Sequence, residues 1–248
     1  MNSLIQTVAE AGLSQTIYDI FFVLGFVSVF LFVVFLGWKM GIKLWKCALV
    51  VLIVYPLMVL WMFILFWIET GRFGGNNIVR VFVYGPVFAY LAAKILKLQW
   101  KDVCAMISIG PAAVHGVSHL GCMFPGCCHG FPSAWGLYSI RAKQILFPIQ
   151  PIEAIIAWLI IIYLLIRAKK RSYVADGKEY PIMLIMFGST RFICEFFRDN
   201  PKLWLGCSSL AFHALFMCIV GIIALVVINQ RYKKANAAAL EAGTHSAS

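Results

Sequence analysis

The sequence carries little charge. Asp, Glu, Lys and Arg make up 12% of its 248 residues, whereas a soluble domain carries about a quarter. This deficit, beside 62% hydrophobic residues, excludes a disordered protein, a secreted disulfide scaffold and an ordinary cytosolic enzyme. The net charge of +11 does not indicate nucleic acid, because the basic residues form short clusters between long apolar runs. We therefore predict an all-α, polytopic membrane protein without a nucleic-acid partner.

Two further absences refine this prediction. The first nineteen residues contain no Lys or Arg, so they lack the basic segment that opens a signal peptide, and we expect the first apolar run to be retained. The sequence also shows no internal repeat, whereas transporters usually show paired inverted repeats. A transporter is therefore less favoured than an enzyme, although a non-catalytic lipid-binding protein stays possible.

The apolar runs predict seven spanning helices, since about 20 mainly apolar residues cross a bilayer. They are Ile17–Gly37, Cys47–Ile68, Val79–Leu96, Val103–Leu120, Pro151–Ile166, Pro181–Phe197 and Ser209–Ile228. The third, fifth and sixth runs are short, as suits helices that border an irregular interior. Seven spans place the two termini on opposite sides of the membrane.

Lys and Arg counts give the orientation, because cytoplasmic loops are enriched in both. Most of these residues follow the first, third and fifth runs or lie in the C-terminal tail. We therefore predict an outer N-terminus and a cytoplasmic C-terminus. Residues 1–234 would form a single transmembrane domain, and residues 235–248 a disordered cytoplasmic tail.

The sixth run carries three charged residues, Arg191, Glu195 and Arg198. Steps of four and seven return to one face of a helix, so the three side chains share a stripe that must face the protein interior. One interpretation is structural: the stripe would form an intrahelical Arg–Glu ion pair that does no more than hold two helices together. Because charge inside a membrane is expensive, we favour a functional role.

In the predicted topology, nearly all other conspicuous polar residues share the outer leaflet with this stripe. They are Tyr18, Tyr84, His115, Ser118, His119, Gln150, Glu153 and the loop Gly121–Gly130. We therefore expect a single polar cavity reached from the outer face or from lipid. The planar fork of Arg matches two phosphate oxygens, and the abundant membrane phosphate is a phospholipid headgroup.

The eight cysteines include a cluster of three in the outer loop, namely Cys122, Cys127 and Cys128, with Cys207 on the same side. Three interpretations of this cluster stay open. It could be a loop braced by disulfides, which persist outside the cytoplasm. It could perform thiol or thiol–disulfide chemistry, although the chain contains no Cys-x-x-Cys. It could bind a metal together with His115, His119 or His129.

Three motifs, in this order, resemble the prolipoprotein diacylglyceryl transferase family of bacteria. The first, Gly116–Gly130, follows the glycine frame of the signature Gly-x-x-Arg-x-Gly-Asn-Phe-x-Asn-Gly-Glu. The second, Pro148–Glu153, is similar to Pro-Ser-Gln-Leu-Tyr-Glu. The third and most specific, Gly188–Pro201, is similar to Arg-x-x-x-Glu-Phe-x-Arg. Tyr18 also matches a tyrosine of the family's first span.

The resemblance implies a seven-span enzyme that moves a diacylglyceryl group from phosphatidylglycerol to the lipobox cysteine thiol of a prolipoprotein, releasing glycerol phosphate. Arg191 and Glu195 match a functional Arg and Glu of the family. His119 stands where the signature has Arg, Cys122 where it has Asn, and Cys127 where it has Glu. Tyr84 replaces a functional His of the third span.

We therefore predict a transferase of the bacterial inner membrane. Catalysis would fall to His119, Arg191, Glu195, Cys122 and Cys127, with His119 taking the missing base or cation role. Substrate would be bound by Tyr18, Tyr84, Gln150, Glu153, Arg198 and Cys128. Phosphatidylglycerol and the lipobox peptide are the expected partners, and we expect no cofactor or metal. A divergent homologue that uses the cysteines chemically on another outer-leaflet substrate is the main alternative.

Overall fold

The structure is a computed structural model that describes residues 1–72, 78–201 and 208–245. Among these residues, five helical segments are long and apolar enough to cross a membrane. They are α2 (Ser14–Lys39), α3 (Leu44–Thr70), Trp100–Gly121, α7 (Ile149–Lys170) and Ser209–Ala238 of α9 (Ser209–His245). The chain is thus mainly α-helical, with several apolar helices of membrane-spanning length.

The third and sixth predicted spans correspond to shorter elements. The third is divided into a 3-10 helix, η1 (Ile78–Tyr84), and the 12-residue helix α4 (Gly85–Leu96). The sixth is α8 (Glu179–Glu195), which has 17 residues. The fifth, predicted to be short, is the 22-residue helix α7. The apolar run is shorter than the helix because polar residues lie near the start of α7 and basic residues lie in its last turn.

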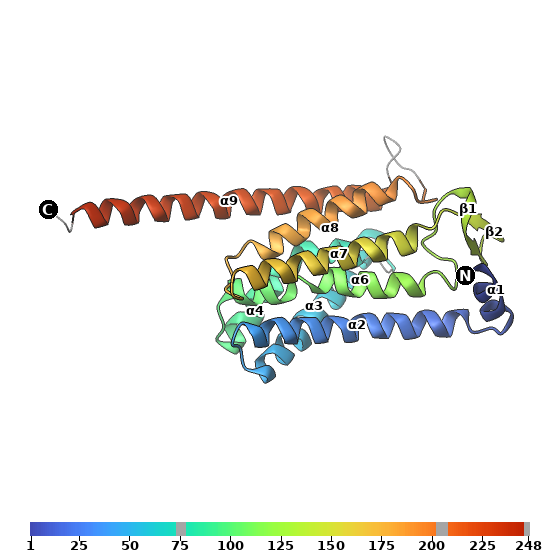
Figure 1. Cartoon of the computed structure of the whole chain (residues 1–248), viewed down its shortest axis with the longest axis horizontal. Coiled ribbons are helices and arrows are strands. Elements are labelled where there is room, and N and C mark those ends of the chain that lie inside the picture. Colours follow the sequence, from blue (N-terminus) through green and yellow to red (C-terminus); the bar gives the residue numbers. More distant parts are fainter. Residues whose placement is uncertain (73–77, 202–207, 246–248) are drawn as a thin grey trace.

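Helix α9 continues to His245, through residues where a disordered tail is predicted. The segment Ala235–Glu241 is rich in Ala, which has the highest helix propensity of all residues. Figure 1 shows this helix projecting well beyond the other helices at the C-terminal end.

An all-α prediction also misses a β-hairpin. Strand β1 (Pro132–Ser139) pairs antiparallel with β2 (Gln144–Leu146), and the register joins Tyr138 to Ile145. Helix α1 (Asn2–Glu10) packs nearby, where the Asn2 side chain accepts a hydrogen bond from the Tyr138 N–H at 3.0 Å. Hairpin and α1 together lie at the end of the molecule opposite the projecting part of α9 (Figure 1).

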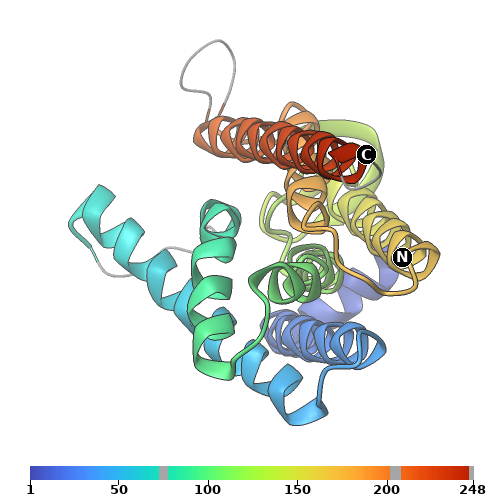
Figure 2. The ribbon, with the colours of Figure 1, turned by 90° about the vertical axis from the view of Figure 1, so that its left-hand side faces the viewer.

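The segment Trp100–Gly121 lies inside the bundle and is the most buried of the five long segments. It consists of α5 (Trp100–Ile107) and α6 (Gly110–Gly121), separated at Ser108 and Ile109. The break precedes Pro111, which has no backbone N–H to donate to the Ile107 carbonyl four residues earlier. Helix α6 packs extensively against α2 and α7. Figure 2, an end-on view, shows the other helices around this segment.

Glycines allow two close approaches that position the site. A Cβ on Gly188 of α8 would lie 2.9 Å from the Ala214 oxygen and from the Cys218 nitrogen of α9. A Cβ on Gly121, at the end of α6, would lie 2.6 Å from Cβ of Phe21 in α2. Close packing at these points fixes α8 and α6, which carry most of the polar residues described next.

Candidate active site

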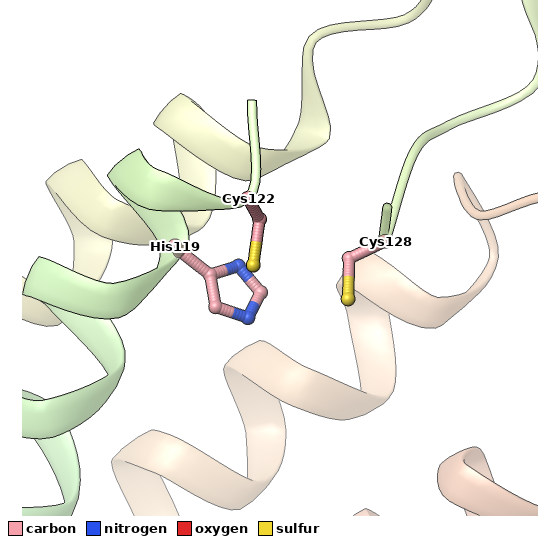
Figure 3. Close-up of side chains that lie close together, drawn as sticks. All are labelled: His119, Cys122 and Cys128. Atoms are coloured by element: carbon pink, nitrogen blue, oxygen red, sulfur yellow. The ribbon is translucent and has the colours of Figure 1, made fainter. Parts of the chain in front are cut away.

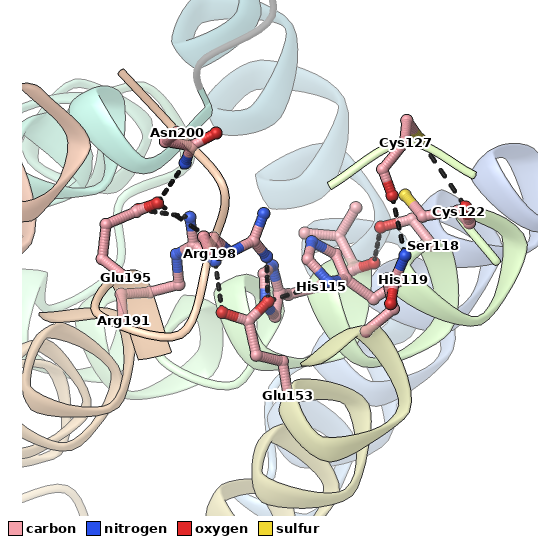
Figure 4. Close-up of polar contacts among 12 residues, drawn as sticks. His115, Ser118, His119, Cys122, Cys127, Glu153, Arg191, Glu195, Arg198 and Asn200 are labelled. Carbon is pink, nitrogen blue, oxygen red and sulfur yellow. Dashed lines mark hydrogen bonds and ion pairs between the residues drawn. The ribbon is translucent and has the colours of Figure 1, made fainter. Parts of the chain in front are cut away.

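A cluster of ionisable side chains surrounds Glu153, near the start of α7. The Glu153 side chain is fully buried, and Arg191 and Arg198 each donate a hydrogen bond to one of its two oxygens. Arg191 lies on α8, whereas Arg198 follows the end of that helix. A single carboxylate therefore joins α7 to both cations of the charged stripe (Figure 4).

Glu195 completes the charged part of the cluster. Its carboxylate lies 3.4 Å from Nη2 of Arg191 and 3.9 Å from Nε of Arg198, and it accepts a hydrogen bond from the Asn200 amide. The predicted stripe therefore exists, and Arg191 and Glu195 form the predicted intrahelical pair. The pair is part of a network that also includes Glu153 on another helix, so it is more than a local helix contact.

Two histidines of α6 face the same carboxylate. Nδ1 of His119 lies 2.9 Å from Oε2 of Glu153, and Nε2 of His115 lies 3.4 Å from the same oxygen. Neither contact has hydrogen-bond geometry. The two rings lie against each other with centroids 3.8 Å apart, and His115 also meets the edge of Phe187. Their i and i+4 spacing thus places both on the site-facing side of α6.

Burial makes this cluster chemically unusual. Each of its six ionisable residues is at most 8% exposed. They are His115, His119, Glu153, Arg191, Glu195 and Arg198. Two arginines and two glutamates balance in charge, which offsets much of the cost of burial. In addition, Nε of Arg191 has no hydrogen-bond acceptor among the described residues, so this guanidinium keeps a donor for an incoming anion.

Backbone pairing brings the cysteine loop to the cluster. Gly130 forms an isolated bridge with Arg198, and the Asp199 N–H donates to the His129 oxygen. On the other side, the Gln150 amide donates to the Cys127 oxygen at 2.9 Å. Gln150, in the first turn of α7, therefore holds the cysteine loop against that helix.

The three loop cysteines are free thiols, and a disulfide-braced loop is not what the structure contains at Cys122, Cys127 and Cys128. Cys207 lies outside the described residues. The neighbouring Cys122 and Cys127 thiols, with the positive charge of Arg198, lower the pKa of Cys128. The loop thus combines a buried thiol, Cys122, with an exposed one, Cys128.

Within the described part of the chain, two groups of side chains have a geometry that could hold a metal ion. In one, the ligand atoms of His119, Cys122 and Cys128 all lie within 4.8 Å of one another (Figure 3). The other consists of His115, His119 and Glu153. His129, the third histidine considered from the sequence, belongs to neither group, and its Nδ1 lies 3.1 Å from the Gly130 oxygen.

The two predicted tyrosines occupy different places. Tyr18 lines an open cavity of about 350 Å³ with Gln15, Pro125, Cys127 and Arg141, next to the cysteine loop. Tyr84 lies against Trp61, in a separate cavity that Arg80 and His213 also line. Tyr18 therefore adjoins the site, whereas Tyr84 is not among the residues that surround Glu153.

Sequence reasoning gave His115 no role beyond lining the polar cavity, missed Asn200, and placed Glu153 in a lesser role. His115 shares a helical face with His119, and that spacing was the available signal. Asn200 lies two residues after Arg198, and no spacing rule identifies it. Glu153, predicted only to bind substrate, is the carboxylate around which the whole cluster is arranged.

The fold and the site together define a class of protein: an α-helical protein with several apolar helices of membrane-spanning length and a buried cluster of Arg, Glu and His at one end of its bundle. The family model described as prolipoprotein diacylglyceryl transferase matches residues 8–227. The chain therefore belongs to the prolipoprotein diacylglyceryl transferase family. The motifs that carry the resemblance all contribute side chains to the cluster or to the adjoining loop.

Two relatives carry the corresponding enzyme name. A phosphatidylglycerol–prolipoprotein diacylglyceryl transferase of Clostridium tetani is 28% identical over 161 residues, which are 60% of this chain and 63% of that protein. A second, from Clostridium perfringens, named phosphatidylglycerol–prolipoprotein diacylglyceryl transferase 2, is 26% identical over 162 residues, or 60% of this chain and 61% of its own length. The match thus spans less than two thirds of each relative.

Proposed function

We propose that this protein transfers a diacylglyceryl group from phosphatidylglycerol to the lipobox cysteine thiol of a prolipoprotein, with release of glycerol phosphate. The observation that carries the proposal is the buried Arg191–Glu153–Arg198 arrangement in a member of this family. The names of the two clostridial relatives support the same donor and acceptor.

The distribution of basic residues gives the orientation of the protein in the membrane. The end of α7 opposite Glu153 carries Arg167, Lys169 and Lys170, and Arg171 follows directly. Enrichment in Lys and Arg marks the cytoplasmic side, so the Glu153 end faces outward. The protein is then a multi-pass protein of the bacterial inner membrane, and its site lies in the outer leaflet, within reach of phospholipid headgroups and of an exported prolipoprotein.

The chemistry assigns roles to the cluster. The reaction forms a C–S bond and breaks a C–O bond, and the electron pair of the C–O bond passes to the leaving phosphate. Arg191, with an Nε donor that no described acceptor satisfies, binds this phosphate as negative charge develops on it. Arg198 adds a second positive charge, while Glu153 and Glu195 hold both guanidiniums in position.

The acceptor thiol must become a thiolate, because the thiolate is the nucleophile. His119 is the group placed between the charged cluster and the cysteine loop, so it is positioned to favour the thiolate form of the incoming thiol. Tyr18 and the cavity that it lines beside Cys127 form the approach for the acceptor peptide. Phosphate is thus bound on the α8 side of the site and the thiol on the α6 side.

The decisive experiment incubates purified protein with phosphatidylglycerol vesicles and a lipobox peptide, followed by mass spectrometry. We expect a diacylglyceryl mass gain on the peptide cysteine and none on a peptide with Ser at that position. Absence of any gain with correctly folded protein would contradict the proposal. It would favour the alternative in which the cysteines act on another outer-leaflet substrate.

A further inference from the structure

We propose that His119, Cys122 and Cys128 form a site for a thiophilic divalent cation of the Zn²⁺ class, and that the acceptor cysteine binds as its fourth ligand. The second half of this inference rests on the proposed function, whereas the first half does not. It replaces the expectation of a metal-free protein.

Geometry supports the three-ligand set. The imidazole nitrogen and the two Sγ atoms lie within 4.8 Å of one another, a separation that small side-chain rotations bring to a common tetrahedral centre. Figure 3 shows the three side chains directed toward one region between α6 and the loop. Two Cys and one His are also a known ligand set of catalytic zinc sites, which keep their fourth position open.

The loop conformation directs Cys128 toward the site at some cost. Its φ is +56°, a left-handed conformation that few residues other than glycine adopt. Strain of this kind persists only where surrounding contacts impose it, and it clusters at functional sites. Here the Gly130–Arg198 bridge and the Gln150–Cys127 hydrogen bond hold the loop from both sides.

The carboxylate behind His119 fits a metal ligand. Metal-binding histidines usually direct their second ring nitrogen to a carboxylate, which fixes the ring. In this structure Nδ1 of His119 lies 2.9 Å from Glu153, without hydrogen-bond geometry. A cation bound at Nε2 would leave the Nδ1 proton for Glu153, and a small rotation of the ring would complete that hydrogen bond.

Charge distinguishes this group from the other candidate set, His115, His119 and Glu153. Arg191 and Arg198 already neutralise Glu153 and would repel a cation there. At the sulfur group, the thiolates of Cys122 and Cys128 would balance the two charges of the cation. Thiolate and imidazole are moreover the ligands that a borderline-soft cation prefers.

The exposed side of Cys128 leaves room for a fourth ligand. The acceptor thiol would lose its proton to solvent on binding the cation. Its sulfur would then attack the glycerol carbon, forming the C–S bond while the phosphate leaves with the C–O electron pair.

The first test needs no transfer activity. The whole protein is purified in detergent after expression with zinc, and its metal content is measured by mass spectrometry. We expect about one Zn²⁺ per chain, with at least a tenfold loss in Cys122→Ser, Cys128→Ser and His119→Gln. Cys127→Ser and Cys194→Ser, at neighbouring thiols outside the ligand set, are the matched controls and should retain the metal.

A measurement on wild-type protein tests the site even if the variants fail to fold. After removal of zinc with a chelator, added Co²⁺ should give the thiolate charge-transfer and intense visible bands of a tetrahedral site. No metal binding, loss of two thiols to a disulfide, or loss of the metal from Cys127→Ser would each overturn the assigned site.

The second test adds a lipobox peptide to the cobalt form. A peptide with Cys should change the visible bands, and the same peptide with Ser should not. Unchanged bands would overturn the acceptor role while leaving the metal site in place. Metal binding and altered bands without any lipid transfer would instead contradict the proposed function alone.

Discussion

Two ion clusters occupy opposite ends of α7, and they are built differently. The cluster around Glu153 draws its members from α6, α7, α8 and the segment after α8, and all of them are buried. The cluster around Asp176 contains Arg167, Arg171 and Glu179. Its members are near neighbours in sequence, and Arg171 has 42% of its side chain exposed. About 14 residues, or roughly 20 Å of helix, separate Glu153 from Arg167.

The difference indicates which cluster serves chemistry. In the Asp176 cluster, contacts between residues close in sequence stabilise the turn between α7 and α8. For example, the Lys178 N–H donates to the Asp176 carboxylate. A buried set that joins several helices costs desolvation energy which simpler apolar packing would avoid, so a structural role alone is a weak explanation for it. Four substitutions test this contrast, from the largest expected effect to the smallest.

Glu153→Gln should have the largest effect. It removes the carboxylate that pairs both buried arginines and leaves two uncompensated cations. Breaking a buried pair in this way typically costs about 3–5 kcal/mol. We expect a marked loss of thermal stability in detergent together with loss of transfer activity, measured by size-exclusion chromatography after heating and by the lipobox assay.

The matched control is Glu179→Gln, which alters a buried glutamate at the other end of α8. Burial raises the pKa of this carboxyl, helped by the neighbouring Asp176. Neutralising it should therefore cost little stability and leave transfer intact. Equal losses in the two variants would show that the clusters do not differ in the way proposed.

Arg191→Ala should abolish transfer with a smaller effect on stability, because Arg198 still neutralises Glu153. A lost charge-stabilising donor costs on the order of 100- to 1,000-fold in rate. Glu195→Ala, which removes the partner of both guanidiniums, should behave similarly. Arg191→Lys keeps the charge but not the planar fork, so it should recover only part of the activity.

Ser189→Ala is a suitable control on the same helix, since its hydroxyl bonds within α8 and contacts Cys218 of α9. Wild-type turnover in Arg191→Ala or in Glu195→Ala would remove that residue from the catalytic assignment.

Residues of the Glu153 cluster differ in how well the sequence alone predicted their place in the site. Arg191 and Glu195 lie on α8 and Arg198 follows three residues after its end, so helical periodicity was enough to predict that the three side chains lie together. The role of Glu153 depends on how α7 packs beside α8, and no local pattern encodes that packing. The third predicted span covers the residues of η1 and α4, but its apolar pattern did not distinguish a 3-10 helix from an α-helix. Asn200 was not predicted as a site residue because it lies in irregular structure after α8, where no helical or strand period applies.

Asp176→Asn should have a moderate effect confined to stability. Burial alone would raise the pKa of Asp176, but the Lys178 N–H, Glu179 and Arg167 outweigh it, and the pKa is lowered. A lowered pKa in the folded state stabilises the protein above the unfolded pKa of about 4, and this contribution is lost as pH falls through the folded value. We expect a loss on the order of 1–2 kcal/mol at pH 7.

Thermal unfolding of wild type and variant across pH 3 to 7 checks this sign. The two curves should converge toward the acid end, with lipid transfer at pH 7 unchanged. A constant difference at all pH values would mean that the lost contribution is packing rather than charge.

Arg171→Ala should have the smallest effect of the four. Its guanidinium lies 3.3 Å from the Asp176 carboxylate, but the side chain is 42% exposed, and Arg167 contacts the same oxygen at 2.6 Å. Exposed ion pairs contribute about 0–1 kcal/mol, so stability should change by less than about 1 kcal/mol and transfer should stay at the wild-type rate. Arg198→Ala, which removes a cation from the other cluster, is the direct counterpart and should abolish transfer. If both substitutions were harmless, pairing with a shared carboxylate would be structural at both ends of α7, and the phosphate would have to be bound elsewhere.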